Sequence, residues 1–162
     1  MNNRESYINQ EIARLTHSFT SLLLLVGAPA ILSLSILDYF AYPEKFKDFI
    51  IYRIIAATLY MVLYSITRFK KGEKINIAVT VLATIIVSGM IELMILAFGG
   101  HQSTYYAGMI IVFIFLFGLV PISFKLSLIL TGIIYTIYLV PILVFDTITN
   151  ISLFASNTIF LT

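Results

Sequence analysis

Apolar residues fill most of the chain in long runs that short polar stretches separate. The runs cover residues 19–40, 49–66, 75–98, 106–124 and 126–145, and a helix needs roughly 20 such residues to cross a bilayer. A sixth run begins near Ile148, but up to Thr162 it would reach only about 22 Å at about 1.5 Å per residue. The pattern predicts an all-α integral membrane helical bundle with five complete transmembrane helices and a truncated sixth, as in a piece of a longer protein.

The first 17 residues carry a different pattern. Charged and apolar side chains alternate there at helical spacing, which is typical of a short amphipathic helix lying at the membrane interface. We therefore expect two parts, an interfacial amphipathic segment over residues 1–17 and a transmembrane helical bundle over residues 18–162. The side chains that make the pattern are Arg4, Glu5, Glu11 and Arg14 among Tyr7, Ile8, Ile12 and Leu15.

Composition agrees with a membrane protein and narrows its chemistry. Hydrophobic residues make up 60% of the chain and charged residues 11%, against roughly 25% charged residues in soluble domains. The net charge of +2 is too small to indicate a nucleic-acid partner. The chain has no cysteine, so a disulfide framework and a thiolate metal site are excluded. We expect no cofactor and no metal, because the two histidines, His17 and His101, are predicted on opposite membrane faces.

The placement of lysine and arginine predicts the orientation. Seven of these residues fall on one side of the predicted bundle, and only Lys45 and Lys47 fall on the other. Because cytoplasmic loops carry the excess of basic residues, we expect a cytoplasmic N-terminus and an outward-facing turn over residues 99–105. A multi-pass membrane protein follows. The seven residues are Arg4, Arg14, Arg68, Lys70, Lys71, Lys74 and Lys125.

Three ionisable residues, Asp38, Arg53 and Glu92, lie inside predicted spans near their outer ends. Charges within a bilayer usually face one another or a wet cavity. We expect Arg53 to pair with Glu92, with Asp38 near the rim, as either a structural ion pair or part of a ligand site. Stripes of hydroxyl side chains should face the bundle interior and bond between helices. These stripes are Thr80, Thr84 and Ser88, then Tyr60 and Tyr64, then Thr131, Tyr135 and Tyr138.

The turn between the third and fourth spans holds further candidates. Gly99 and Gly100 are expected to end the helix with positive φ, and Ser103 or Thr104 to cap the next one. His101 fits a solvated loop residue, a ligand-binding group or a pH sensor. Tyr105 and Tyr106 fit either aromatic anchors at the interface or ligand contacts. The candidate site for a small amphipathic ligand with a polar or anionic group is therefore Asp38, Arg53, Glu92, His101, Tyr105 and Tyr106.

The sequence FGGHQSTYYAG over residues 98–108 resembles the FGGHxSPYYAG-type signature of six-helix membrane modules. Thr104 stands where that pattern has proline. Such modules precede the outputs of bacterial sensor histidine kinases and class III nucleotide cyclases. The resemblance implies an N-terminal sensory input domain of a receptor, as in two-component systems, whose partners are the lipid bilayer, a small-molecule ligand and a C-terminal cytoplasmic output domain. A homodimer and a place in the bacterial cytoplasmic (inner) membrane are expected on the same basis.

Other classes stay open on the sequence alone. A membrane anchor or dimerisation module needs only the helices, and a small transporter would also use intramembrane charge. Asp38, Glu92 and His101 form a weak acid and base set for an enzyme, but no spacing among them matches a catalytic motif. We therefore expect these 162 residues to have no catalytic activity of their own.

Overall fold

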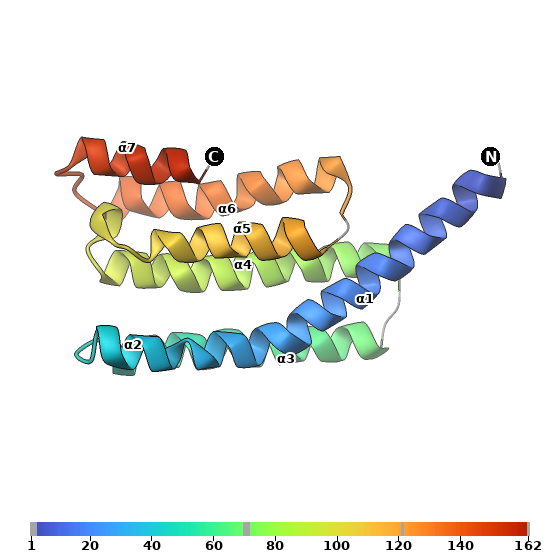
Figure 1. Cartoon of the computed structure of the whole chain (residues 1–162), viewed down its shortest axis with the longest axis horizontal. Coiled ribbons are helices and arrows are strands. Elements are labelled where there is room, and N and C mark those ends of the chain that lie inside the picture. The colour runs from blue at the N-terminus through green and yellow to red at the C-terminus, as the bar shows by residue number, and fades with distance from the viewer. Residues whose placement is uncertain (1–2, 70–71, 121, 162) are drawn as a thin grey trace. The chain divides into compact units, whose positions relative to one another are not determined.

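The computed structural model describes residues 3–69, 72–120 and 122–161, and every regular element in these ranges is a helix (Figure 1). The all-α prediction is confirmed. The elements are α1 Asn3–Ser33, α2 Ser35–Ala41, α3 Phe46–Phe69, α4 Glu73–Ala97, the 3₁₀ helix η1 Gly100–Gln102, α5 Tyr106–Leu119, α6 Phe124–Phe145 and α7 Ile151–Phe160.

Four helical stretches in the described residues are long and apolar enough to cross a membrane. They are Arg14–Ala41, which joins most of α1 to α2, and then α3, α4 and α6. The predicted span over residues 106–124 is shorter than expected, because α5 has 14 residues and the chain leaves the helix before the next one starts. Ser123 caps that next helix, α6, by accepting a hydrogen bond from the Leu126 N–H at 3.4 Å. Four long apolar stretches are thus shown in the described residues, while α5 and the 10-residue α7 are shorter, so the prediction of five complete spans is not confirmed.

The N-terminal segment is continuous with the first span. α1 runs for 31 residues with no break near residue 17, and Pro29 lies within it. The first interruption is at Leu34, between α1 and α2. Lys70, Lys71 and Pro121 lie outside the described residues, so the orientation that rests partly on those lysines stays a prediction.

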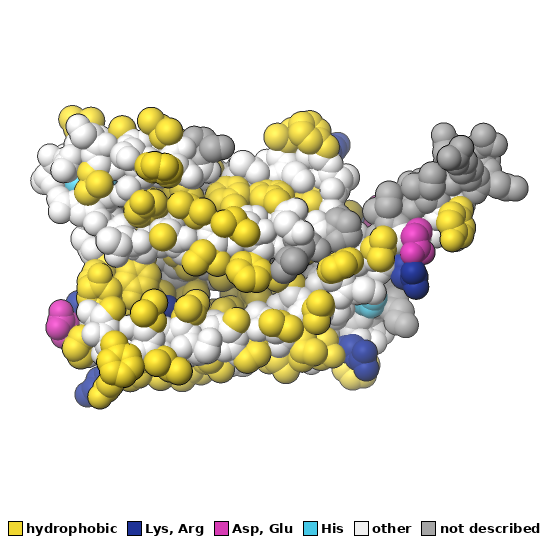
Figure 2. All heavy atoms as spheres, in the orientation of Figure 1, with side chains coloured by type: hydrophobic (Ala, Val, Ile, Leu, Met, Phe, Trp, Pro, Cys, Tyr) yellow, Lys and Arg dark blue, Asp and Glu magenta, His cyan; other side chains and the backbone are white. Residues whose placement is uncertain are grey.

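Large apolar side chains cover much of the exposed surface. Figure 2 shows hydrophobic side chains along the flanks of the helices on one face, with few charged side chains among them. Phe40, Phe69, Phe124 and Phe145 are each more than three-quarters exposed. Soluble proteins rarely expose such continuous apolar surface, whereas lipid chains are the expected neighbours of a membrane helix.

The helices form two compact units. The first unit comprises Met1–Ala83 and Leu119–Ile122, and the second comprises Thr84–Gly118 and Ser123–Thr162. The helix α4 contributes its first half to the first unit and its second half to the second. Each unit is described separately below.

Hydrogen bonds between side chains join the helices of the first unit. Thr20 of α1 bonds Thr80 of α4 at 3.2 Å, and the Tyr60 hydroxyl donates to the Ala83 carbonyl at 3.2 Å. The prediction that hydroxyl side chains of the stripes bond between helices is thus confirmed for Thr80 and Tyr60. Two more bonds of this kind join His17 to Asn76 at 3.0 Å and Ser21 to Thr67 at 3.1 Å.

The second unit is built around an apolar core from α4, α5 and α6. A Cβ added to Gly108 of α5 would lie 3.3 Å from Ile91 of α4, so the absence of a side chain lets these two helices approach closely. The fully buried apolar side chains of the second unit are Met94, Ile95, Met109, Leu130, Ile134 and Ile142.

Candidate functional site

Two consecutive glycines shape the turn between α4 and α5. Gly99 has φ +88° and Gly100 has φ +56°, as predicted, and this left-handed region is accessible to glycine at little cost. A Cβ at Gly100 would also collide with the carboxylate of Asp146. Ser103 accepts a hydrogen bond from the Tyr105 N–H at 3.2 Å immediately before α5 begins. The turn is thereby held in a shape that presents His101 to the connection between α6 and α7.

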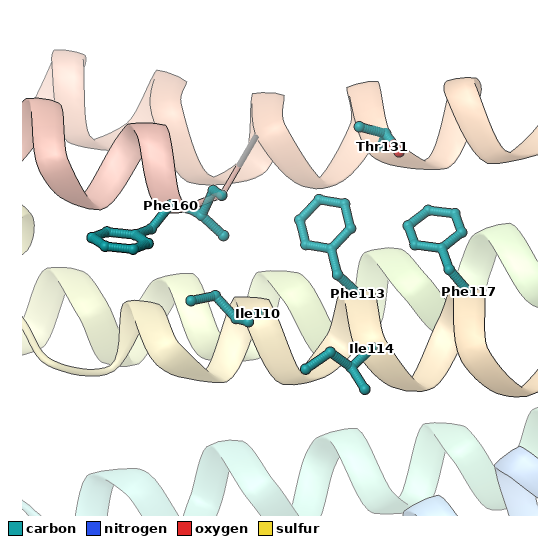
Figure 3. A pocket seen from close by; sticks show the side chains of 7 residues that line it. Ile110, Phe113, Ile114, Phe117, Thr131 and Phe160 are labelled. Carbon is teal, nitrogen blue, oxygen red and sulfur yellow. The ribbon is translucent and has the colours of Figure 1, made fainter.

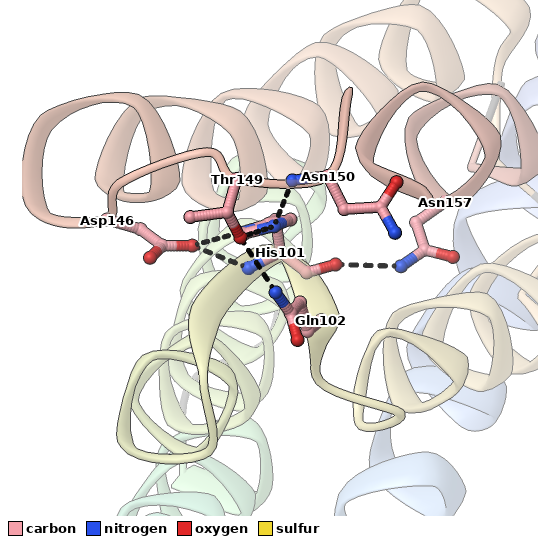
Figure 4. A network of polar contacts seen from close by, with 6 residues as sticks. All are labelled: His101, Gln102, Asp146, Thr149, Asn150 and Asn157. Carbon is pink, nitrogen blue, oxygen red and sulfur yellow. Dashed lines mark hydrogen bonds and ion pairs between the residues drawn. The ribbon is translucent and has the colours of Figure 1, made fainter. Parts of the chain in front are cut away.

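The imidazole of His101 is buried, with 2% of the residue exposed, and it is bonded on both sides (Figure 4). Its Nδ1 lies 2.7 Å from Oδ2 of Asp146, and the backbone N–H of Asn150 donates to Nε2 at 3.2 Å. Because Nε2 accepts a hydrogen, the ring is neutral and its single proton is on Nδ1, where it is donated to Asp146. The expectation of a solvated loop histidine is wrong.

Further bonds complete this arrangement, which we call the His101 clasp and which comprises His101, Gln102, Asp146, Thr149, Asn150 and Asn157. The backbone N–H of His101 also donates to Oδ2 of Asp146 at 2.7 Å. The Asn157 side chain of α7 donates to the His101 carbonyl at 3.0 Å, and the Gln102 side chain donates to Thr149 at 2.9 Å. The clasp thus joins the α4–α5 turn to the α6–α7 connection and to α7 itself.

Asp146 is the acidic member of the clasp, and its side chain is 19% exposed. Burial alone would raise the pKa of this carboxyl, but the backbone and ring N–H groups of His101 favour the ionised form and together hold the pKa below its usual value. Asp146 is therefore a charged acceptor at neutral pH.

Glu92 and Ser88 are buried polar residues of a different kind. They lie one turn apart on α4, 3% and 0% exposed. The described residues have four buried side-chain nitrogen or oxygen atoms without a hydrogen-bond partner, and three of the four are the Ser88 hydroxyl and both Glu92 carboxylate oxygens. Buried polar groups in folded proteins are nearly always bonded, so this unsatisfied pair marks a place where a partner from outside the chain is expected.

Tyrosines lie close to this pair in the second unit. Tyr138 of α6 is 1% exposed, is near enough to Glu92, Tyr106 and Tyr135 to interact with them electrostatically, and hydrogen-bonds the Thr158 side chain of α7. We call Ser88, Glu92, Tyr106, Tyr135 and Tyr138 the Glu92 cluster. Lys125 is the single lysine or arginine between residues 84 and 162, and it is exposed in the first turn of α6.

A groove of about 340 Å³ opens between α5, α6 and the end of α7 (Figure 3). Phe113 and Phe117 point from α5 toward α6, and their rings stack with centroids 5.6 Å apart. Apart from Thr131, the lining side chains are apolar: Ile110, Phe113, Ile114, Phe117, Phe160 and Leu161.

The buried charges of the first unit are fully engaged. Arg53 of α3 binds Asp38 of α2 through two bonds, from Nε at 2.6 Å and from Nη2 at 3.0 Å. Its Nη1 donates to the Ile31 carbonyl at 3.2 Å. The prediction that Arg53 pairs with Glu92 is therefore wrong: its acidic partner is Asp38, which is buried rather than at a rim.

The six predicted site residues thus separate into two groups. Asp38 and Arg53 bind each other in the first unit, whereas Glu92, His101, Tyr105 and Tyr106 belong to the second. Tyr105 is half-buried and its ring lies 5.6 Å from that of Phe98. Ligand binding by these residues stays a prediction. Among the described residues, no group of three or more His, Asp or Glu side chains is placed to hold a metal ion.

Asp146, Asn157 and Tyr138 have roles that the sequence patterns did not predict. One signal was present for the first of them. Glu92 and Asp146 are the only acidic residues after Glu73, and Asp146 follows a predicted span on the same predicted membrane face as His101. For Asn157 and Tyr138 the sequence carries no comparable signal.

A comparison with known families places the chain. The family model of MASE8 matches residues 36–162. The chain belongs to the MASE8 family. MASE domains are membrane-associated sensory domains, so the class of domain that the resemblance implied is confirmed, while the signature itself and the association with kinases or cyclases stay predictions. No curated protein and no solved structure matches the chain.

The matched range includes all three groups of polar residues described above. It begins within α2 and takes in the Arg53–Asp38 pair, the Glu92 cluster and the His101 clasp. The four apolar helical stretches agree with a multi-pass MASE8 domain.

Proposed function

We propose that this MASE8 domain is the input domain of a bacterial signalling receptor in the cytoplasmic membrane. It binds a small molecule in its second unit and relays that event to a C-terminal cytoplasmic output domain, of the histidine kinase or nucleotide cyclase type, within a homodimer. The observation that carries the proposal is the Glu92 carboxylate, which is buried and has no hydrogen-bond partner among the described residues.

The energetic argument favours a role in binding. A charged side chain in a membrane helix costs roughly 2.5–3.5 kcal/mol near the bilayer centre, and an unsatisfied buried group costs about 1–3 kcal/mol. A purely structural helix would avoid both costs with leucine at position 92. A site that waits for a ligand has a reason to keep the carboxylate.

The connections from Glu92 supply a route for the signal. Glu92 is on α4, Tyr138 next to it is on α6, and the Tyr138 side chain hydrogen-bonds Thr158 on α7. Asn157, the residue before Thr158, bonds the turn that follows α4. A ligand that displaces Tyr138 therefore acts on α7, the helix to which a C-terminal output domain would be joined.

The test is a chimera of residues 1–162 with an adenylate cyclase catalytic domain, read as cyclic AMP in cells exposed to fractionated metabolite extracts. We expect at least one fraction to change the output of the wild-type chimera and to leave the Glu92→Gln chimera unchanged. Glu73→Gln is the matched control, since Glu73 is exposed on the same helix. Equal responses of the Glu92→Gln and wild-type chimeras, or no response to any fraction, would contradict sensing and favour a membrane anchor.

A further inference from the structure

The charges of the buried side chains decide what kind of ligand the site can take. Both candidate cations are already neutralised or neutral. The carboxylate of Asp38 balances the positive charge of Arg53. The Nε2 atom of His101 accepts a hydrogen bond from the Asn150 N–H, so the ring carries no charge. Among the buried side chains that the structure describes, none is therefore a free cation that could bind the anionic ligand group considered from the sequence.

The remaining unpaired group in the second unit is acidic. Both oxygens of Glu92 and the hydroxyl of Ser88 lack partners among the described residues, and a carboxylate offers only acceptors. The group that satisfies it must donate hydrogen bonds, and it also balances the charge if it is cationic. A primary ammonium meets both conditions with its three N–H donors.

The tyrosines near Glu92 favour the same chemistry. Tyr138 interacts electrostatically with Glu92 and also with two further tyrosines, Tyr106 and Tyr135. Aromatic faces attract cations, and the attraction is strongest when the cation is desolvated. A carboxylate among aromatic rings is thus suited to an ammonium and unsuited to a carboxylate or phosphate.

Helical spacing places several residues of the apolar groove on the same helix faces as tyrosines of the cluster. Ile110 and Phe113 follow Tyr106 on α5 by four and seven residues, which places them on one face. On α6, Thr131 precedes Tyr138 by seven residues on one face in the same way. Tyr106 and Phe113 are seven residues apart, about 10 Å along the helix axis, which leaves room for an apolar tail next to the cluster.

We propose that the second unit binds a small amphipathic amine, a further step that rests on the proposed sensing function. Its ammonium group bonds the Glu92 carboxylate and the Ser88 hydroxyl among the tyrosines. Its apolar tail lies in the groove lined by Phe113, Phe117 and Leu161.

The experiment measures equilibrium binding of radiolabelled n-octylammonium to the full chain in phosphatidylcholine nanodiscs. n-Octanol and n-octanoate serve as competitors that have the same tail and a different head group. We expect saturable binding that excess unlabelled octylammonium displaces and that octanoate does not displace. Glu92→Gln should weaken binding at least about tenfold, since a hydrogen bond to a charged group is lost, while Glu73→Gln should not change it.

Some results overturn the proposal. The proposal is wrong if octanoate displaces the label as effectively as octylammonium does, or if the wild-type and Glu92→Gln proteins bind it with equal affinity. It is also wrong if the protein shows no saturable binding beyond that of empty nanodiscs. If Glu92→Gln fails to fold, competition on the wild-type protein still decides, because the head-group preference needs no variant.

The outcomes also separate this proposal from the sensing function. Glu92-dependent amine binding without any change in the output of the cyclase chimera supports the amine site and contradicts the relay. A chimera that responds to a fraction through Glu92 while octylammonium does not bind supports sensing and contradicts the amine.

Discussion

Replacing Asp146 by alanine tests how much the His101 clasp stabilises the second unit. The substitution removes the acceptor of two bonds at 2.7 Å, one from the backbone N–H of His101 and one from its ring. Each donor left unsatisfied in a buried position costs about 1–3 kcal/mol. The 19% exposure of the Asp146 side chain lets water reach part of the site, so we expect a loss of about 2–4 kcal/mol in the free energy of unfolding.

The measurement is reversible unfolding of the purified protein in mixed micelles, followed by the loss of helical circular dichroism. Glu44→Ala is the matched control, because Glu44 is an exposed acidic residue in the connection between α2 and α3, and such substitutions usually change stability by less than about 0.5 kcal/mol. If Asp146→Ala lowers the free energy of unfolding no more than the control does, the clasp does not stabilise the second unit.

The same residue gives a pH dependence with a definite sign. The pKa of Asp146 is held below its usual value in the folded protein. Its contribution to stability is therefore fully present above the ordinary value of about 3.9 and is lost as the pH falls through the lower folded-state pKa. The stability difference between wild-type and Asp146→Asn proteins should shrink on acidification below about pH 4, and a constant difference would contradict the assignment.

Three further predictions concern other parts of the chain. Arg53→Leu and Asp38→Leu should each destabilise the protein by about 3–5 kcal/mol, while the double variant recovers much of the loss; additivity within about 0.5 kcal/mol would mean that the two residues do not interact. Gly100→Ala should lower the free energy of unfolding, measured by thermal unfolding, by more than about 1 kcal/mol, because Gly100 has a positive φ and an added Cβ would collide with the Asp146 carboxylate. Gly118→Ala is the control and should be neutral or stabilising, since the space at its Cβ is open. Equal effects of the two substitutions would contradict this prediction. Gln102→Cys should react with a membrane-impermeant maleimide added outside intact cells, and reaction only after permeabilisation would reverse the orientation.

Much of the fold follows from the length of the apolar runs. The runs at residues 49–66, 75–98 and 126–145 lie within or within one residue of α3, α4 and α6, because continuous apolar sequence in a membrane has helix as its main option. Helix ends were less predictable. α5 stops at Leu119, since a capping serine at position 123 starts a new helix inside the same apolar run.

The pairing of charges was harder to predict than the helices. Asp38 and Glu92 are both predicted near the outer ends of their spans, at a depth similar to that of Arg53. Depth in the membrane therefore does not decide which of the two carboxylates pairs with Arg53. The connection from Tyr42 to Lys45 is short, so α2 and α3 are neighbours in the chain and bring Asp38 next to Arg53. The clasp depended on contacts between two loops 45 residues apart, which single-sequence patterns do not report.

The backbone amide of Asn150 is in an unusual position for a residue that is exposed and outside any helix. Its hydrogen is donated to an imidazole nitrogen, while the side chain of the same residue caps α7 by accepting from Leu153. This amide should exchange with deuterium far more slowly than its neighbours in the connection, at a rate set by the opening of the loop. Deuterium uptake over residues 146–153 would thus follow the opening of this end of the domain directly, with no label attached and no residue changed.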